Sequence, residues 1–419
     1  MAEVKPLHAL HYDLGRAGSL ADLLAPPYDV IDARKRRQLL ARSPHNAVEL
    51  DLPEDPAGGD RYRHAARTLE AWRAEGVLVA DDEPALWALE QSYAGPDRRD
   101  YVRRGLLARV GVTEYGPGLV RPHERTQPGP KRDRLELTRA TRHNLSPIFS
   151  LHPGDVWDLV EPVLGEPWGE ASDDGGTRNR IWRVAEPRAL DAVTASLASA
   201  ELLIADGHHR YETARVYADE VGGEGDHRYT LMCLVSLDDP GLTVFGYHRL
   251  LGGFAGTDRP EALARALREH FEIEEVSEAE LDPAGADGVG VFGYIDSHLR
   301  RGFRLRLKDA ALVDELLGGR SAAYRRLDAA ILEELVLKRA LGMSPEDVEA
   351  KRGIGYAKSA AEALGAISEG GDYQVAFLLR PTPVEQVREV AAAGETMPPK
   401  STFFYPKVPT GIVFNPVGP

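Results

Sequence analysis

Four polar side chains and one glycine follow a short apolar segment in the run Asp206–Arg210, which reads Asp-Gly-His-His-Arg. The apolar residues 202–205 predict a buried strand, and residues 211–221 predict a helix that ends at a pair of glycines. The first amide groups of a helix have no partner within the helix and attract anions. A strand that runs through this box into a helix therefore predicts a site for a phosphate-bearing ligand.

Each side chain of the box suits part of that chemistry. Asp206 could bind a hard cation or accept a proton from a hydroxyl, and Gly207 allows an unusual backbone angle or a close approach. Arg210 offers a forked donor for phosphate oxygens. His208 and His209 are adjacent, so on a helix they point about 100° apart and are not expected to share one zinc ion. The alternative is structural: Asp206 caps the helix, Arg210 pairs with it, and the histidines pack.

A second candidate lies at Glu124 in the segment Pro122–Thr126, which opens a polar stretch rich in Arg and Lys. Positive neighbours favour the ionised form of a carboxyl group. This suits a glutamate that accepts a proton or holds magnesium, and it equally suits a surface glutamate in an ion-pair network.

Two further segments combine polar side chains with a backbone stiffened by proline. The tail carries Lys400, Ser401 and Lys407, which could close over an anion or simply be solvated. Near the N-terminus, Tyr28 and Asp29 follow two consecutive prolines, which hold the chain extended. Active-site lining and ordinary turn chemistry both fit this second segment.

The elements that must position these residues alternate between strands and helices. Three pairs of neighbouring strands are predicted, at 85–93 with 101–112, 232–237 with 241–247, and 289–295 with 302–307. Helices are predicted at 60–76, 188–200, 211–221, 259–270, 321–341 and 384–393. The fold class is therefore α+β, in the sense of a mixed α/β chain.

A chain of 419 residues is long enough for two or three domains. The glycine-rich segment Gly252–Gly256 resembles a linker, so we expect one domain over residues 1–250, holding the active site, and a smaller α/β region over 251–419 that contributes the tail.

The charge balance, the cysteine content and the lengths of the apolar runs argue against several classes of protein. With 51 Lys and Arg against 66 Asp and Glu, the net charge is −15, which argues against non-specific binding to nucleic acid or an anionic membrane. The single cysteine, Cys233, lies in an apolar run and is predicted to be a buried, unreactive thiol. No apolar run of about 20 residues and no signal peptide occur, which predicts a soluble cytoplasmic protein.

Five segments in this order resemble one bacterial and archaeal family, catalogued as domain of unknown function 1015. They are Ala25–Ile31, Pro122–Thr126, Asn144–Phe149, Ala205–Ala214 and Lys400–Lys407. The resemblance covers residues 6–412, and the family name implies no function.

A narrower resemblance concerns two of these segments. The Asp206–Arg210 box is similar to the phosphate-binding box of the ParB/sulfiredoxin-like superfamily, and most of all to that of its free-serine kinases. This implies a ParB/sulfiredoxin-like core elaborated by insertions. It also implies that Glu124 is the catalytic base, Asp206 the catalytic aspartate, and His208, His209 and Arg210 phosphate binders.

The resemblance and the residues together give one expectation of function. We expect a phosphoryl-transfer enzyme that acts on a small hydroxylated metabolite, and above all a kinase of free L-serine that uses ATP, ADP or pyrophosphate. A phosphoserine phosphatase that uses the same site and a non-catalytic nucleotide-binding regulator remain alternatives. Magnesium is expected at Asp206, and the oligomeric state stays open. Phosphate or nucleotide binding is assigned to Gly207, His208, His209, Arg210, Lys400, Ser401 and Lys407. Substrate binding is assigned to Tyr28, Asp29, His123 and Thr126.

Overall fold

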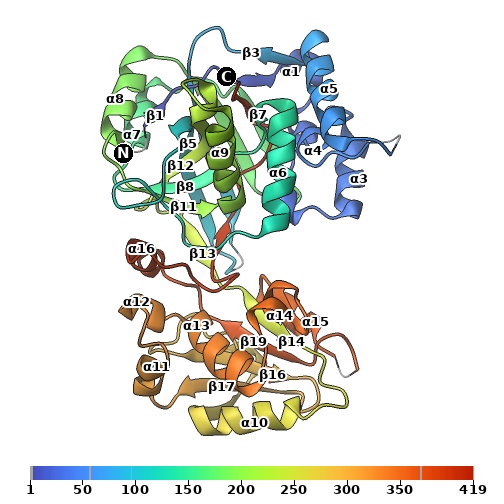
Figure 1. The fold of residues 1–419 in the computed structure, drawn as a ribbon, viewed down its shortest axis with the longest axis vertical. Coiled ribbons are helices and arrows are strands. Elements are labelled where there is room, and N and C mark those ends of the chain that lie inside the picture. The colour runs from blue at the N-terminus through green and yellow to red at the C-terminus, as the bar shows by residue number, and fades with distance from the viewer. Residues whose placement is uncertain (1–2, 56–57, 96, 369, 419) are drawn as a thin grey trace. The chain divides into compact units, whose positions relative to one another are not determined.

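The computed structural model describes residues 3–55, 58–95, 97–368 and 370–418 and divides the chain into two compact units (Figure 1). The first comprises residues up to Pro122, Thr126–Thr243 and Pro406–Pro419; the second comprises His123–Arg125 and Val244–Tyr405. The sheets and helices of both confirm the mixed α/β class. Within these described residues, no helix has the length and apolar character that crossing a bilayer requires.

The first unit is built on a nine-stranded mixed sheet. Its strand order is β6-β11-β8-β12-β5-β4-β10-β9, with β1 added beside β5. The strands of this unit are β1 Val4–Lys5, β2 Leu10–Tyr12, β3 Leu78–Ala80, β4 Leu86–Ala94, β5 Asp100–Gly111, β6 Val120–Arg121, β7 His143–Asn144, β8 Ile148–His152, β9 Gly169–Ser172, β10 Arg178–Val184, β11 Leu202–Asp206, β12 Tyr229–Ser236 and β21 Asn415–Pro416. β8 pairs in parallel with β12, and β11 in parallel with β6, whereas the other pairs are antiparallel.

The helices of the first unit pack in two hydrophobic cores, of which only one includes the nine-stranded sheet. They are α1 Leu14–Ala17, α2 Leu20–Leu23, α3 Ala33–Arg42, α4 Val48–Asp51, α5 Arg61–Ala74, α6 Pro128–Thr141, α7 Trp157–Val160, α8 Pro187–Leu197 and α9 His208–Val221, with short 3-10 turns at η1 Tyr28–Val30, η2 Glu161–Val163 and η3 Asp226–Arg228. α6 and α9 lie side by side (Figure 1). One core joins the sheet to α8 through residues such as Trp182, Val193 and Ile204.

The second unit has a six-stranded antiparallel sheet of order β15-β17-β16-β19-β14-β18. Its strands are β14 His248–Leu251, β15 Phe271–Val276, β16 Val291–Asp296, β17 Arg301–Leu307, β18 Ile354–Ala357 and β19 Val375–Leu379; β13 Thr243–Phe245 precedes them and β20 Phe403–Tyr405 follows. Its helices are α10 Arg259–His270, η4 Glu278–Glu280, α11 Ala310–Leu316, α12 Ala322–Arg325, α13 Asp328–Leu332, the π-helix η5 Glu333–Ala340, α14 Pro345–Glu349, α15 Ala360–Ala366 and α16 Val384–Ala392.

Two of the three predicted strand pairs are confirmed, as β4 with β5 and β16 with β17. The prediction that 232–237 pairs with 241–247 is wrong, because β12 pairs with β5 and β8. From Thr230 to Ser236 every residue of β12 is buried, as in a strand with a neighbour on each side. Local alternation cannot identify those neighbours, since they come from distant parts of the chain.

The glycine-rich segment Gly252–Gly256 lies inside the second unit, between β14 and α10, and the described division falls at Thr243. A side chain at Gly252 would overlap the carbonyl oxygen of Asp372, since a Cβ atom would stand 1.8 Å from it. This glycine is therefore explained by close backbone packing.

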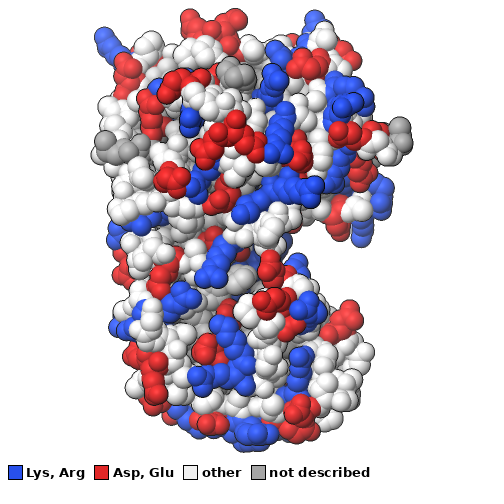
Figure 2. Space-filling model, in the orientation of Figure 1, with Lys and Arg blue, Asp and Glu red and all other residues white. Residues whose placement is uncertain are grey.

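On the face shown in Figure 2, Lys and Arg side chains are interspersed with Asp and Glu side chains on each unit. Cys233 is buried, as predicted, and burial raises the pKa of its thiol to about 12, which disfavours the reactive thiolate.

Candidate phosphate-binding site

The junction between β11 and α9 forms the centre of the candidate site. Leu202–Ala205 are all buried, and the strand ends at Asp206. Gly207 has φ 97° and ψ 28°, a left-handed conformation, and α9 begins at the next residue. The helix starts three residues earlier than the sequence predicts, so both histidines and Arg210 lie in its first turn. Gly207 offers no side chain to cap the helix, and the start of α9 therefore presents amide groups without an intrahelical acceptor.

Asp206 is held between two cations. Its Oδ2 accepts a hydrogen bond of 2.7 Å from Nη2 of Arg210, and its Oδ1 accepts one from the ammonium of Lys407. Burial alone would raise the pKa of Asp206, but Lys407 and Arg210 outweigh burial and hold the pKa well below its usual range. The carboxylate therefore stays ionised at neutral pH and serves as a fixed negative charge between two donors.

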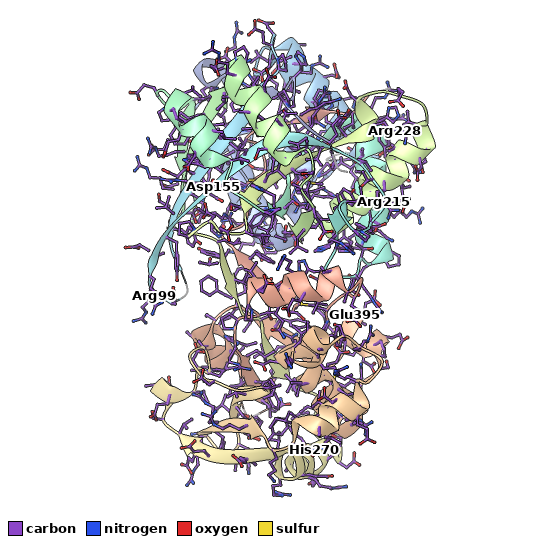
Figure 3. The ribbon with its side chains drawn as sticks, turned by 90° about the vertical axis from the view of Figure 1, so that its left-hand side faces the viewer. Arg99, Asp155, Arg215, Arg228, His270 and Glu395 are labelled. Atoms are coloured by element: carbon purple, nitrogen blue, oxygen red, sulfur yellow. The ribbon has the colours of Figure 1, made fainter. Side chains whose placement is uncertain are left out.

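Arg210 is folded back over the start of its own helix. Its Nη1 donates to the carbonyl oxygen of Pro147 and, at 3.3 Å, to the hydroxyl of Ser146. The guanidinium also covers Gly207, where a Cβ atom would stand 3.0 Å from Cζ and Nε of Arg210. Further along α9, Arg215, which is labelled in Figure 3, makes ion pairs with Glu114 and Glu212 instead. The structural pairing of Asp206 with Arg210 is thus present, together with the lysine that the tail supplies.

This packing makes Gly207→Ala a strong test of the local geometry. The left-handed angle costs a residue with a side chain about 1–2 kcal/mol, and the new methyl group also displaces Arg210. We expect the free energy of unfolding, measured by urea denaturation, to fall by at least that amount. Gly129→Ala on α6 is the matched control, because a Cβ atom there meets nothing within 4 Å. Equal stability of the two variants would contradict the account.

The two histidines of the box have different surroundings. His208 is 7% exposed and is one of the groups that lower the pKa of Asp206. Nε2 of His209 accepts a 2.8 Å hydrogen bond from the backbone N–H of Gln127, the residue that precedes α6. A backbone N–H can only donate, so this nitrogen of His209 carries no proton. His209 thereby joins the start of α6 to the start of α9.

Tyr28 lies near Arg210 and Arg134. The guanidinium of Arg134 stands 4.1 Å from the centre of the Tyr28 ring, and burial raises the pKa of the phenol to about 12, although both arginines oppose the rise. Tyr28 therefore stays a neutral hydrogen-bond donor at neutral pH. Asp29, next to it, is exposed.

A small cavity of about 40 Å³ lies behind Arg210, between α6 and α9. Asp51 and Arg134 form its charged wall, where Nη1 of Arg134 donates to the Asp51 carboxylate at 3.0 Å and to its carbonyl oxygen at 2.6 Å. Burial raises the pKa of Asp51 against the effect of Arg134. The cavity is too small for a nucleotide. We infer that the residues that line it hold Arg210 in place.

The other predicted site residues belong to the second unit, apart from Thr126, a half-buried residue of the first. His123 is 1% exposed, and its Nε2 lies 3.0 Å from the hydroxyl of Thr402. Glu124 forms a parallel bridge with Met397 through its backbone. Its carboxylate makes no hydrogen bond or ion pair within the residues that the structure describes.

Lys400 and Ser401 are held by contacts within the second unit. The carbonyl oxygen of Lys400 accepts from Nη1 of the buried Arg249 at 3.0 Å, and its ammonium lies 5.3 Å from the centre of the Tyr247 ring. The hydroxyl of Ser401 donates to the carbonyl oxygen of Pro398 at 2.6 Å. Their assignment to phosphate stays a prediction.

Three of the five sequence segments contact one another within the first unit, and Ala25–Ile31 and Asn144–Phe149 both contact Thr410, three residues beyond the tail segment. Ala25 and Thr410 form a β-bridge, the Ser146 and Thr410 hydroxyls lie 2.6 Å apart, and the box contacts Pro147 and Lys407 as above. Pro122–Thr126 meets the tail through Thr402 in the second unit. Segments scattered over nearly 400 residues thus share contacts, which argues against five independent packing devices.

Sequence analysis missed Gln91 and Arg103, which face each other on β4 and β5. Nη2 of Arg103 donates to the carbonyl oxygen of Pro406 at 2.6 Å, and Nε2 of Gln91 to that of Lys407 at 3.3 Å. Both strands carry further polar side chains beside this pair, such as Glu90 on β4 and Arg104 on β5, so the pair is not distinctive in the sequence. The acceptors are carbonyl oxygens of the tail, more than 300 residues away in the sequence, and the local residue pattern does not indicate them.

Several solved structures resemble this chain at low sequence identity. Among solved structures, a free serine kinase variant in complex with AMP shares 15% identity, covers 70% of this chain and 88% of its own, and has a TM-score of 0.37. SbnI from Staphylococcus aureus, truncated at its C-terminus, shares 12% identity, covers 74% and 87%, and has a TM-score of 0.38. A conserved hypothetical protein from Pyrococcus furiosus shares 16%, covers 70% and 92%, and has a TM-score of 0.35.

No curated protein matches this sequence. The family model described as "Protein of unknown function (DUF1015)" matches residues 4–330, which include the β11–α9 junction and Glu124. The chain therefore belongs to the DUF1015 family.

Proposed function

We propose that this protein is a phosphoryl-transfer enzyme that acts on a small hydroxylated metabolite, with free L-serine as the first acceptor to test. ATP, ADP or pyrophosphate would supply the phosphoryl group. The observation that carries the proposal is the β11–α9 junction, where Asp206, a left-handed Gly207 and a helix start meet the cations of Arg210 and Lys407.

The cations and the helix start suit the donor phosphates. Amide groups at the start of a long helix bind phosphate oxygens, and a guanidinium and an ammonium neutralise their charge. Phosphoryl transfer depends mainly on such positioning and neutralisation. A phosphate at this junction would share Arg210 and Lys407 with Asp206, which holds both cations at the start of α9.

The role of base is proposed for Glu124, on the resemblance of its Pro-His-Glu segment to that of free-serine kinases. The serine hydroxyl oxygen would bond to the terminal phosphorus while the bond to the bridging oxygen breaks. The hydroxyl proton would pass to the Glu124 carboxylate, and the leaving phosphate would keep the bonding electrons. Asp206 is the poorer base because its lowered pKa makes its carboxylate weakly basic.

The arrangement around Asp206 does not fit the magnesium that the sequence predicts there. Both of its carboxylate oxygens are engaged by cations. Across the described ranges, no group of three or more His, Cys, Asp or Glu side chains gathers in one place. Magnesium stays a prediction for the assay, and no step above depends on it.

Phosphorus NMR tests the proposal in one set of incubations with phosphoserine and magnesium. The tubes contain phosphoserine alone, or with AMP, ADP or phosphate added. A kinase working in reverse forms ADP, ATP or pyrophosphate only where the matching precursor is present, and this product names the donor. Release of phosphate without an acceptor would instead identify a phosphatase that uses the same site. No change in any tube would reject serine and favour a nucleotide-binding regulator.

A further inference from the structure

Arg103 is a buried cation in the central sheet of the first unit. It is 1% exposed, its guanidinium stands 4.4 Å from the centre of the Phe149 ring, and burial lowers its pKa. Among the residues that the structure describes, it has no carboxylate partner at ion-pair distance, and its Nη1 has no hydrogen-bond partner. This side chain is therefore not explained as half of a salt bridge.

The contacts that Arg103 does make lead to the tail. Its Nη2 donates to the carbonyl oxygen of Pro406 at 2.6 Å and also to Oε1 of Gln91, the residue opposite it in the sheet. Gln91 in turn donates from Nε2 to the carbonyl oxygen of Lys407 at 3.3 Å and to Oδ1 of Asn179 at 2.9 Å. Two consecutive carbonyl groups of the tail are thus held by one pair of side chains.

The hydrogen bonds to these two carbonyl groups fix the backbone from which the Lys407 side chain extends. The ring of Pro406 already restricts its own backbone angle. With the backbone held on both sides of the Lys407 Cα atom, the ammonium reaches Asp206, and the Lys407 side chain is only 16% exposed. We propose that Arg103, together with Gln91, is a positioning residue that places Lys407 on Asp206.

Stability alone does not account for an arginine here. A buried guanidinium without a carboxylate loses its hydration, and an N–H group without an acceptor adds to that cost. A methionine would fill a similar volume without either penalty. The gain that distinguishes arginine at this position is the pair of hydrogen bonds to Pro406 and Gln91.

The test measures Lys407 itself in the full-length protein. Amines are acetylated with a limiting amount of acetic anhydride, and peptide mass spectrometry compares the rate at Lys407 with that at the exposed Lys351. We expect Arg103→Met to raise the relative rate at Lys407 by about tenfold, the factor for losing roughly one charge-assisted hydrogen bond. Arg103→Lys, which retains one donor group, should restore part of the protection.

Arg104→Met is the matched control, since the neighbouring side chain on β5 is partly exposed and pairs with Glu90 at 3.2 Å. It should leave the rate at Lys407 unchanged. A folded Arg103→Met protein whose Lys407 reacts as in the wild type would overturn the proposal. If Arg103→Met fails to fold, Gln91→Leu makes the same test, with faster labelling expected and an unchanged rate contradicting the proposal.

The importance of this positioning for turnover rests on the proposed function, but the labelling result does not. Faster labelling of Lys407 in a protein that transfers no phosphoryl group would support the positioning role and reject the proposed function. If the enzyme transfers phosphoryl groups but Lys407 is labelled at the same rate in Arg103→Met as in the wild type, the positioning role would be rejected and the proposed function supported.

Discussion

Asp206→Asn is expected to lower phosphoryl transfer by about 10²–10³-fold, the range for losing one preorganised electrostatic group. It also leaves Arg210 and Lys407 without the carboxylate that both now contact. Because breaking a buried ion pair from one side costs about 3 kcal/mol or more, the free energy of unfolding should fall by a similar amount. Turnover and urea denaturation measure the two effects separately.

The loss of stability should depend on pH in a defined direction. The folded pKa of Asp206 lies below that of the unfolded chain, so its stabilising contribution is complete above about pH 4, the unfolded value. This stabilising contribution is lost as the pH falls below about 4 towards the pKa of Asp206 in the folded protein. The stability difference between wild type and Asp206→Asn should therefore be constant near neutral pH and shrink in acid.

Asp226→Asn serves as the control for this substitution. Asp226 pairs with Arg109 at 2.8 Å, but its side chain is 57% exposed, and exposed pairs contribute about 0–1 kcal/mol. Its effect on turnover and stability should be small. An Asp206→Asn protein as active and as stable as the Asp226→Asn protein would remove Asp206 from the account.

Glu124→Gln is expected to abolish most turnover while leaving the fold intact. The amide keeps the shape of the side chain but cannot accept the hydroxyl proton, so the rate should fall by about 10²–10⁴-fold. The carboxylate makes no hydrogen bond or ion pair in the described parts of the chain, so the free energy of unfolding should change by less than about 0.5 kcal/mol. Nucleotide binding should be retained, since only the proton acceptor is lost.

Glu269→Gln on the exposed side of α10 controls for the substitution itself and should match the wild type. The informative comparison is between turnover and binding. Wild-type turnover in Glu124→Gln would reject Glu124 as the base. Loss of nucleotide binding together with turnover would show that Glu124 acts on the ligand rather than on the proton.

The sequence predicts those parts of the molecule that depend on local pattern. A run of four apolar residues followed by Asp-Gly predicts β11 and its exit loop, because a buried strand must end in residues that allow a turn. The strand pairs β4–β5 and β16–β17 are predictable for the same reason, since each joins neighbours in sequence. Asp206, Gly207 and Arg210 could therefore be placed together from sequence alone.

What depends on distant contacts could not be predicted. Nothing near Lys407 indicates that its ammonium meets Asp206, 201 residues away. The roles of Gln91 and Arg103 are hidden for the same reason, because their acceptors are carbonyl groups that carry no residue signature. α6 was also missed as a helix: its proline-rich start and many charges obscure the inward face formed by Arg134, Leu137 and Thr141.

Phosphate binding at the β11–α9 junction can be measured by calorimetric titration of ADP, pyrophosphate and adenosine into the wild type and into Lys407→Met. If the β11–α9 junction holds phosphate groups, ADP should bind at least about tenfold more tightly than adenosine, as one lost charge-assisted contact implies. Pyrophosphate should compete with ADP, and Lys407→Met should remove most of the difference between ADP and adenosine. Adenosine binding as tightly as ADP, or equal ADP affinity in both proteins, would contradict the account.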